Sequence, residues 1–183
     1  MPVLPFRNNP ISYYRKGEER TYYPEGLFAY YSLIGTRRNP TFDTWDSWAA
    51  RFFVGLSVND VKKYSMNDIV RETRAFLRSY IAPTVIKMPN GKVKRFPAGK
   101  KLKENSTFIA QRGVYAHKKP PHKIVEEKSV QIVIFNETGL AEEQFTQFVK
   151  DFGDHLRVRF RQEAVIAELQ HKGISQFTME ITA

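Results

Sequence analysis

Apolar residues gather in short continuous runs at two places in the chain, residues 51–58 and 129–135. Both runs are rich in aromatic and β-branched side chains, and their length is that of a strand rather than a helix. We therefore expect each run to form a buried strand.

An amphipathic helix is predicted behind each run, because apolar residues there recur every three or four positions. The first helix should begin at a capping box, since Ser65 and Asp68 have the Ser-x-x-Asp spacing, and it should end just before Pro83. The second helix should begin after Gly139 and end at Gly153, because glycine commonly terminates helices.

Two hairpins are also predicted, at 84–96 and at 164–181. The first has Asn90 and Gly91 between two strand-like segments, and this dipeptide tolerates the positive φ angles of a tight turn. A further strand is expected at 107–111, where apolar residues resume after a basic loop.

The two halves of the chain share the order strand, helix, strand pair, which predicts an α+β fold. Two β-α-β units packed together give a ferredoxin-like antiparallel sheet with helices on one face. We expect a single domain at 49–183, with a basic hairpin and loop inserted at about 84–123. Residues 1–48 are rich in Pro, Asn and Tyr, so we expect an irregular aromatic arm that wraps its own domain, stacks on bases or clasps a neighbouring subunit.

The composition is that of an ordinary globular domain. The chain has 183 residues, 42% of them hydrophobic, and no cysteine, so it can fill a core and cannot form disulfides or thiolate metal sites. No apolar run approaches the roughly 20 residues that span a bilayer. The N-terminus lacks the apolar middle of a signal peptide. We therefore expect a cytoplasmic protein without a membrane partner.

Positive charge is concentrated in one segment, residues 87–123. Eleven lysines and arginines face a single acid, Glu104, so the net charge of the segment equals the +10 of the whole chain. Its last part, 117–123, should be a stiff loop because it contains two prolines. Such a segment should attract a polyanion. The predicted nucleic-acid-binding residues in it are Lys87, Lys92, Lys94, Arg95, Lys100, Lys101, Lys103, Arg112, Lys118, Lys119 and Lys123.

A strand is predicted at 156–161, because apolar and basic residues alternate strictly there. A period of two gives one apolar face and one basic face. Guanidinium groups fork onto phosphate oxygens, so the basic face joins the predicted nucleic-acid-binding residues. It consists of Arg157, Arg159 and Arg161. A second group of three arginines lies on the first predicted helix. It could line a phosphate track, but the favoured expectation is a plain solvent-facing surface: Arg71, Arg74 and Arg78.

Phe52-Phe53-Val54-Gly55-Leu56 resembles the first-strand motif of RNA-recognition-motif domains, although the Asn of that motif is missing. Arg112-Gly113-Val114-Tyr115-Ala116 resembles the partner motif, with Val114 in place of its first aromatic residue. The resemblance covers only these two segments. It implies that Phe53 and Tyr115 stack on bases.

If the protein is an enzyme, the candidate catalytic residues are His117, Tyr115 and Lys118. A histidine beside a lysine and a tyrosine can cleave RNA without a metal, by moving the 2′-hydroxyl proton and stabilising the pentacoordinate charge. The four histidines do not form a metal-ligand pattern, so we expect no zinc site and no cofactor.

The charge distribution favours a nucleic-acid-binding protein without catalytic activity, a subunit of a ribonucleoprotein or viral assembly that binds RNA rather than DNA. Two alternatives stay open. One is a metal-independent RNA endonuclease, and the other is a structural or assembly protein whose Tyr-rich arm clasps a neighbour. Nucleic acid is the expected partner, and a protein partner or an oligomer through the N-terminal arm is a further expectation.

Overall fold

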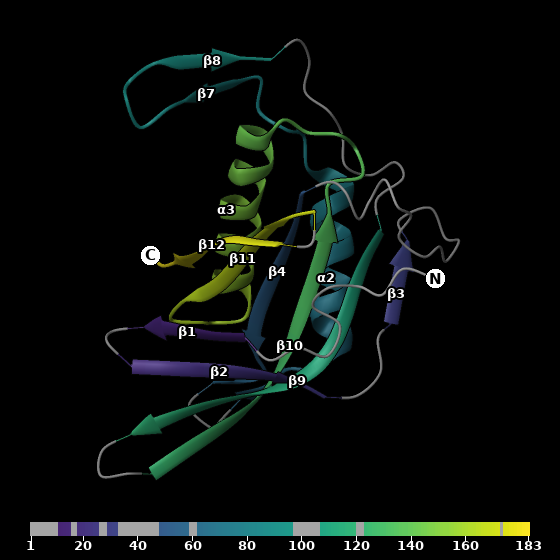
Figure 1. Cartoon of the computed structure of the whole chain (residues 1–183). Helices are drawn as coiled ribbons and strands as arrows, with labels where there is room; N and C mark the ends of the chain where they lie inside the picture. The colour runs from purple at the N-terminus through teal and green to yellow at the C-terminus, as the bar shows by residue number, and fades with distance from the viewer. Residues whose placement is uncertain are drawn as a thin grey trace.

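Strands dominate the fold, and eight of them form one antiparallel sheet (Figure 1). The computed structural model describes residues 11–15, 18–25, 29–32, 48–58, 62–96, 107–119, 123–172 and 174–183. The sheet order is β1-β2-β9-β10-β4-β11-β12, with β3 beside β9. These strands are β1 (Ile11–Arg15), β2 (Glu18–Pro24), β3 (Ala29–Ser32), β4 (Trp48–Gly55), β9 (Thr107–Lys119), β10 (Lys123–Phe135), β11 (Val165–His171) and β12 (Ile174–Ile181).

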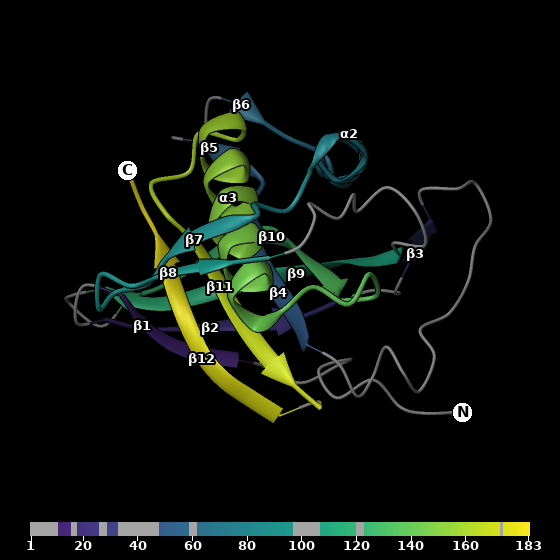
Figure 2. The ribbon, with the colours of Figure 1, turned by 90° about the horizontal axis from the view of Figure 1, so that it is seen from above.

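Two small sheets and two helices complete the described part of the chain. The small sheets pair β5 (Ser57–Val58) with β6 (Lys62–Lys63), and β7 (Val85–Lys87) with β8 (Val93–Arg95). The helices are α2 (Met66–Ser79) and α3 (Glu142–Arg159). Seen from above, α3 crosses the middle of the molecule and α2 lies to one side of it (Figure 2). Neither of these helices is long and apolar enough to cross a membrane.

Aromatic rings build the interface between the helices and the sheet. The ring of Phe52 on β4 meets Phe152 of α3 edge-on, with centroids 4.9 Å apart. Phe76 of α2 lies 5.1 Å from the same Phe152 ring, so one cluster joins the sheet and both helices. Each fully buried ring of this kind contributes roughly 1.5–3 kcal/mol. Because side chains alternate along a strand, the residues on either side of Phe52 belong to the opposite face of the sheet.

The predicted capping box at the start of α2 is confirmed. The backbone N–H of Asp68 donates to the Ser65 hydroxyl at 3.2 Å, and the backbone N–H of Ser65 donates to the Asp68 carboxylate at 2.9 Å. Hydrogen bonds from the Ser65 backbone and hydroxyl stabilise the charged carboxylate and lower the pKa of Asp68. The helix ends before Pro83, as the sequence predicts.

The predicted hairpins are also confirmed, as β7–β8 and β11–β12. Gly91 has a φ of +84° in the first turn, which explains why glycine stands there. The Asn90 side chain accepts the backbone N–H of Lys92 at 3.0 Å and so helps to close the turn. By contrast, the loop expected at 117–123 was predicted too long. β9 continues to Lys119 and β10 begins at Lys123, and residues 120–122, with both prolines, lie outside the described residues.

The predicted ferredoxin-like sheet of two β-α-β units with an irregular N-terminal arm is wrong. Three strands of the sheet come from within residues 1–48, and the sheet curls into a half-barrel in which β1 and β2 lie crosswise to β4 (Figure 1). The reason is the length of β9 and β10, 13 residues each. β9 offers a long edge of hydrogen-bonding groups, and β2 and β3 pair with it.

The predicted end of the second helix is wrong as well. α3 runs through Gly153 to Arg159, because Phe152, Leu156 and Phe160 continue its buried stripe. Gly153 is buried within the helix, and a Cβ atom there would lie 2.1 Å from the Cδ1 atom of Ile181. The glycine therefore allows β12 to approach the helix instead of ending it.

Glu72 connects the two helices. Its carboxylate accepts the Nε–H of Arg159 at 2.9 Å and lies 3.2 Å from Nε2 of His155, both on α3. Burial alone would raise the pKa of Glu72, but the hydrogen bonds from Arg159 and His155 outweigh burial and lower it. A carboxyl with a lowered pKa binds fewer protons when folded than when unfolded. The stability it contributes is therefore present at neutral pH and lost as pH falls through the folded pKa.

We expect Glu72→Gln to lower the free energy of unfolding at pH 7 by roughly 0.5 to 1 kcal/mol, because the contact is only partly buried. The deficit should shrink between about pH 5 and about pH 3, where the wild-type carboxyl also becomes neutral. Urea unfolding at several pH values measures this. Glu142→Gln makes the same charge change at an exposed position of α3 and should show no comparable deficit. Equal losses in the two variants, or a loss independent of pH, would contradict the role of Glu72.

Candidate functional site

The basic residues of segment 87–123 that the structure describes do not form one surface. Figure 1 shows the β7–β8 hairpin at one end of the molecule and the tip of the β9–β10 hairpin at the other. Lys87, Lys92 and Arg95 belong to the first hairpin, and the backbone of Lys118, Lys119 and Lys123 belongs to the second. Lys100, Lys101 and Lys103 lie outside the described residues. Arg112 is exposed in the middle of β9.

Carboxylates neutralise several of the predicted phosphate-binding groups. Lys94 lies 2.6 Å from Glu143, Arg157 lies 2.8 Å from Asp154, and Arg159 lies 2.9 Å from Glu72. The prediction of a strand at 156–161 with one basic face is wrong, because Arg157 and Arg159 lie in the last turn of α3 and Arg161 in the turn after it. In a helix, residues two apart do not share a face.

The predicted base-stacking and catalytic residues are either buried or not described at the level of their side chains. Phe53 is 1% exposed, and the Tyr22 ring covers it with the two centroids 4.7 Å apart, so it has no free face for a base. Tyr115, His117 and Lys118 belong to β9, where Tyr115 pairs with Tyr22 and Glu127 and His117 pairs with Arg20 and Val125. Their side chains lie outside the described part of the structure.

The sheet face opposite the helices holds an unusual set of buried polar groups, which we name the polar sheet face. Its members come from the four central strands, β9, β10, β4 and β11, and alternate with the core residues of those strands. They are Arg51, Gln111, Ser129, Gln131, Glu168 and Gln170, each at most 5% exposed. Polar side chains are rarely buried in such number on one face, so this face is the first candidate site.

An ion pair stands at the centre of the polar sheet face. Arg51 and Glu168 are directly opposite each other on β4 and β11. The guanidinium donates from Nε to one Glu168 oxygen at 3.1 Å and from Nη2 to the other at 3.3 Å. Gln170 donates a further short hydrogen bond to the same carboxylate. A buried carboxylate needs this many donors, because an uncompensated charge at such depth is very costly.

Beside the ion pair, three polar atoms have no hydrogen-bond partner among the described residues. They are the Ser129 hydroxyl and the side-chain oxygens of Gln131 and Gln170. The amide nitrogen of Gln131 does have a partner, since it donates to the Gln111 side chain at 2.6 Å. Buried polar atoms are nearly always satisfied, so these three suggest contacts to groups beyond the described residues.

Tyr22 and Gly55 also lie on this side of the sheet, where Tyr22 packs against Phe53. The Tyr22 hydroxyl donates to the Gln111 carbonyl oxygen at 3.3 Å and lies where a Cβ on Gly113 would be. Burial raises the pKa of Tyr22, although the Arg51 charge opposes this, so its hydroxyl stays protonated at neutral pH. The backbone of Gly55 exchanges two hydrogen bonds of 3.1 Å with the Gln162 amide, and a Cβ there would meet the Glu127 carboxylate.

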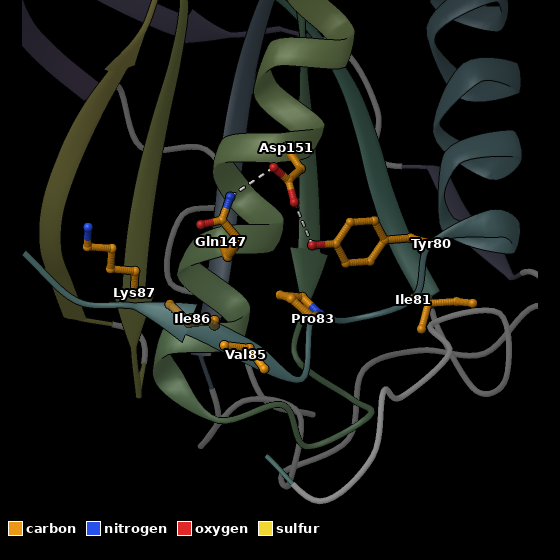
Figure 3. Close-up of a pocket in the computed structure, with 8 residues that line it drawn as sticks. All are labelled: Tyr80, Ile81, Pro83, Val85, Ile86, Lys87, Gln147 and Asp151. Carbon is orange, nitrogen blue, oxygen red and sulfur yellow. Dashed lines mark hydrogen bonds between the residues drawn. The ribbon is translucent and has the colours of Figure 1, made fainter. Parts of the chain in front are cut away.

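A second candidate is an open pocket of about 390 Å³ between α3 and the β7–β8 hairpin (Figure 3). Asp151 accepts the Tyr80 hydroxyl at 2.8 Å and the Gln147 amide at 2.9 Å. Burial, together with the Asp151 hydrogen bond and charge, raises the pKa of Tyr80. Lys87 lies at the far end of the pocket, and Ile86 lines its wall. The Asp151 carboxylate of this pocket is paired with neutral donors, whereas the Glu168 carboxylate of the polar sheet face is paired with a guanidinium.

The sequence contains a signal for the polar sheet face. Arg51 stands in the apolar run 51–58, Gln131 stands in the run 129–135, and Glu168 follows the same pattern in β11. A polar residue inside a strand that is otherwise apolar indicates a second buried face with its own polar contacts.

Neither a protein-family model nor a curated protein matches the chain. Two solved structures are similar to it, both of a phage SAM lyase. The first is a complex with S-methyl-5'-thioadenosine, which is 38% identical, covers 75% of this chain and 91% of that chain, and has a TM-score of 0.51. The second is the apo state, which is 37% identical, covers 76% of this chain and 91% of that chain, and has a TM-score of 0.53.

These similarities overturn the predicted non-catalytic, nucleic-acid-binding subunit, because the similar protein is an enzyme. The expectation that this protein lacks catalytic activity is therefore wrong. The two alternatives, an RNA endonuclease and an assembly protein, do not agree with a SAM lyase either. With more than a third of its aligned residues identical over nine-tenths of that enzyme's length, the chain belongs to the phage SAM lyase family.

Proposed function

We propose that this protein cleaves S-adenosylmethionine and releases S-methyl-5'-thioadenosine. The observation that carries the proposal is the 38% identity with a phage SAM lyase that binds S-methyl-5'-thioadenosine, over 91% of that enzyme's length. The polar sheet face is the proposed binding site, because it offers hydrogen-bonding groups in excess of those it uses itself.

The chemistry of a sulfonium substrate fits such a site. A lyase breaks the bond between carbon and sulfur without adding water, and the bonding electrons go to sulfur. The positive sulfonium becomes a neutral thioether, so the leaving group needs no proton from an acid. The amino-acid fragment completes its valence from within, either by closing a ring through its own carboxylate or by losing a proton from the adjacent carbon.

Because charge on sulfur disappears in this reaction, a bare carboxylate beside the sulfonium would stabilise the substrate more than the transition state. The ion pair of the polar sheet face avoids that penalty. Glu168 is compensated by Arg51, and the neighbouring amides of Gln131 and Gln170 are neutral. Neutral dipoles can orient an adenosine and an amino-acid group without holding the sulfonium charge in place. Since Tyr22 covers part of this face, a ligand must enter beside that ring or displace it.

The purified protein should convert S-adenosylmethionine to S-methyl-5'-thioadenosine with no other reagent added. Chromatography of the nucleoside products measures this, against a sample without protein that records spontaneous breakdown. Proton NMR of the second product decides between ring closure and proton loss. If S-methyl-5'-thioadenosine accumulates no faster than in the sample without protein, the proposed function is wrong.

Ser129→Ala tests the position of the site. Ser129 is 1% exposed and its hydroxyl has no partner among the described residues, so removing the hydroxyl should leave the protein at least as stable as wild type. If a ligand uses the hydroxyl, the affinity for S-methyl-5'-thioadenosine should fall about three- to tenfold, the value of roughly one neutral hydrogen bond. Titration calorimetry and thermal unfolding of the same samples separate the two effects.

Tyr80→Phe and Asp151→Asn are the matched variants at the second candidate, the pocket of Figure 3. We expect both to bind S-methyl-5'-thioadenosine as wild type does, because that pocket is not part of the polar sheet face. If these variants lose affinity while Ser129→Ala keeps it, the site lies in the pocket and the assignment to the polar sheet face is wrong.

A further inference from the structure

A pocket of about 450 Å³ lies along α2, and the proposed cleavage reaction makes no use of it. Its lining includes Arg71, Arg74 and Arg78 from the helix, Asn67 from the first turn and Tyr31 from β3. The sequence alone suggested that these arginines are plain solvent-facing surface. The structure instead places all three around one hollow.

The helix itself explains why the arginines gather. Residues three and four positions apart lie on the same face, so Arg71, Arg74 and Arg78 form one row. With a rise of about 1.5 Å per residue, the row extends over roughly 10 Å. A row of three guanidiniums at this spacing offers forked donors at successive steps along the helix.

Arg74 is held in place by the core. Its guanidinium lies over the Tyr31 ring, 5.1 Å from the centroid. The Tyr31 ring also stacks on Phe108 of β9, which is fully buried, with centroids 5.1 Å apart. An aromatic ring anchored in this way restricts the guanidinium before any ligand arrives, so less entropy is lost when it binds. The Nε atom of Arg74 is buried and has no hydrogen-bond partner among the described residues.

Within the described part of the chain, carboxylates compensate little of the charge of this row. Asp68 lies 3.8 Å from Arg71 and already accepts hydrogen bonds from Ser65. Glu72, on the same helix, is occupied by Arg159 and His155 of α3. Other arginines of the protein show the contrast, since Arg51, Arg157 and Arg159 each lie within 3.1 Å of a carboxylate.

We propose that the α2 pocket binds a small anion that carries two or more linked phosphate groups, such as the polyphosphate of a nucleotide. Guanidinium forks match phosphate oxygens in geometry and charge. A chain of linked phosphates follows a row of three arginines better than a single phosphate does. S-adenosylmethionine and S-methyl-5'-thioadenosine contain no phosphate, so this site is distinct in chemistry from the polar sheet face. The proposal therefore does not depend on the proposed function.

Titration calorimetry with inorganic triphosphate tests the proposal, with orthophosphate at matched ionic strength as the comparison. Triphosphate should bind with a defined stoichiometry near one, and orthophosphate should bind at least tenfold more weakly. Arg74→Gln should weaken triphosphate binding about tenfold or more, because it removes charge-assisted hydrogen bonds. Arg95→Gln makes the same charge change on the β7–β8 hairpin and should leave the affinity unchanged.

Two variants of Tyr31 test whether the ring positions Arg74. Tyr31→Phe keeps the aromatic face and should bind triphosphate as wild type does. Tyr31→Leu removes the face and should weaken binding several-fold. Thermal unfolding of both variants shows whether the Leu variant is still folded at the temperature of the titration. If it is not, Arg74→Gln, at a half-buried position of α2, carries the test alone.

The proposal is overturned if triphosphate does not bind, or if Arg95→Gln and Arg74→Gln weaken binding equally, which would indicate attraction to net charge alone. A competing single-stranded oligonucleotide supplies a third outcome. If the oligonucleotide displaces triphosphate from the wild-type protein at equal phosphate concentration and Arg74→Gln abolishes the effect, the ligand of this site is a nucleic acid and the small-anion proposal is wrong.

Discussion

The fold depends on one constraint, which is that β4 must be buried on both faces. Seven of its eight residues are buried, with only Trp48 half-exposed. On one face Phe52 packs against the helices, and on the other Arg51 stands among polar groups. A strand in this position cannot solvate its polar side chains, so each must find a partner across the sheet. The hydrogen bonds between Arg51 and Glu168 meet that need for the charged groups.

The same constraint explains why the site is expected on the sheet face and not between the helices. The helix side is filled by aromatic rings that contact one another directly, as Phe52, Phe76 and Phe152 do, and it leaves little for a polar ligand to bind. On the opposite face, the Ser129 hydroxyl and the side-chain oxygens of Gln131 and Gln170 have no hydrogen-bond partners among the described residues. Such atoms weaken a fold unless they serve a purpose, and ligand binding supplies one.

Local features were predictable from the sequence because their causes lie within a few residues. The capping box of Ser65 and Asp68 and the turn at Gly91 are of this kind. The strands β2 and β3 could not be predicted in the same way, because their partner β9 is distant in sequence: Tyr22 pairs with Tyr115 and Tyr31 with Phe108, 93 and 77 residues further along the chain. The predicted end of α3 was wrong for a related reason. Gly153 leaves room for the side chain of Ile181, which is distant in sequence, and does not end the helix.

The basic residues show the converse case, in which residues close together in sequence lie far apart in the structure. Segment 87–123 is continuous in sequence, yet the two hairpins to which it contributes lie at opposite ends of the molecule (Figure 1). In addition, Glu143 neutralises the charge of Lys94. The polar residues of the sheet face come from four strands spread over most of the chain, and the register of the ladder brings them together. Proximity in sequence therefore indicates a shared surface only where a single element enforces it. The row of arginines on α2 meets that condition, because helical geometry alone keeps its members on one face.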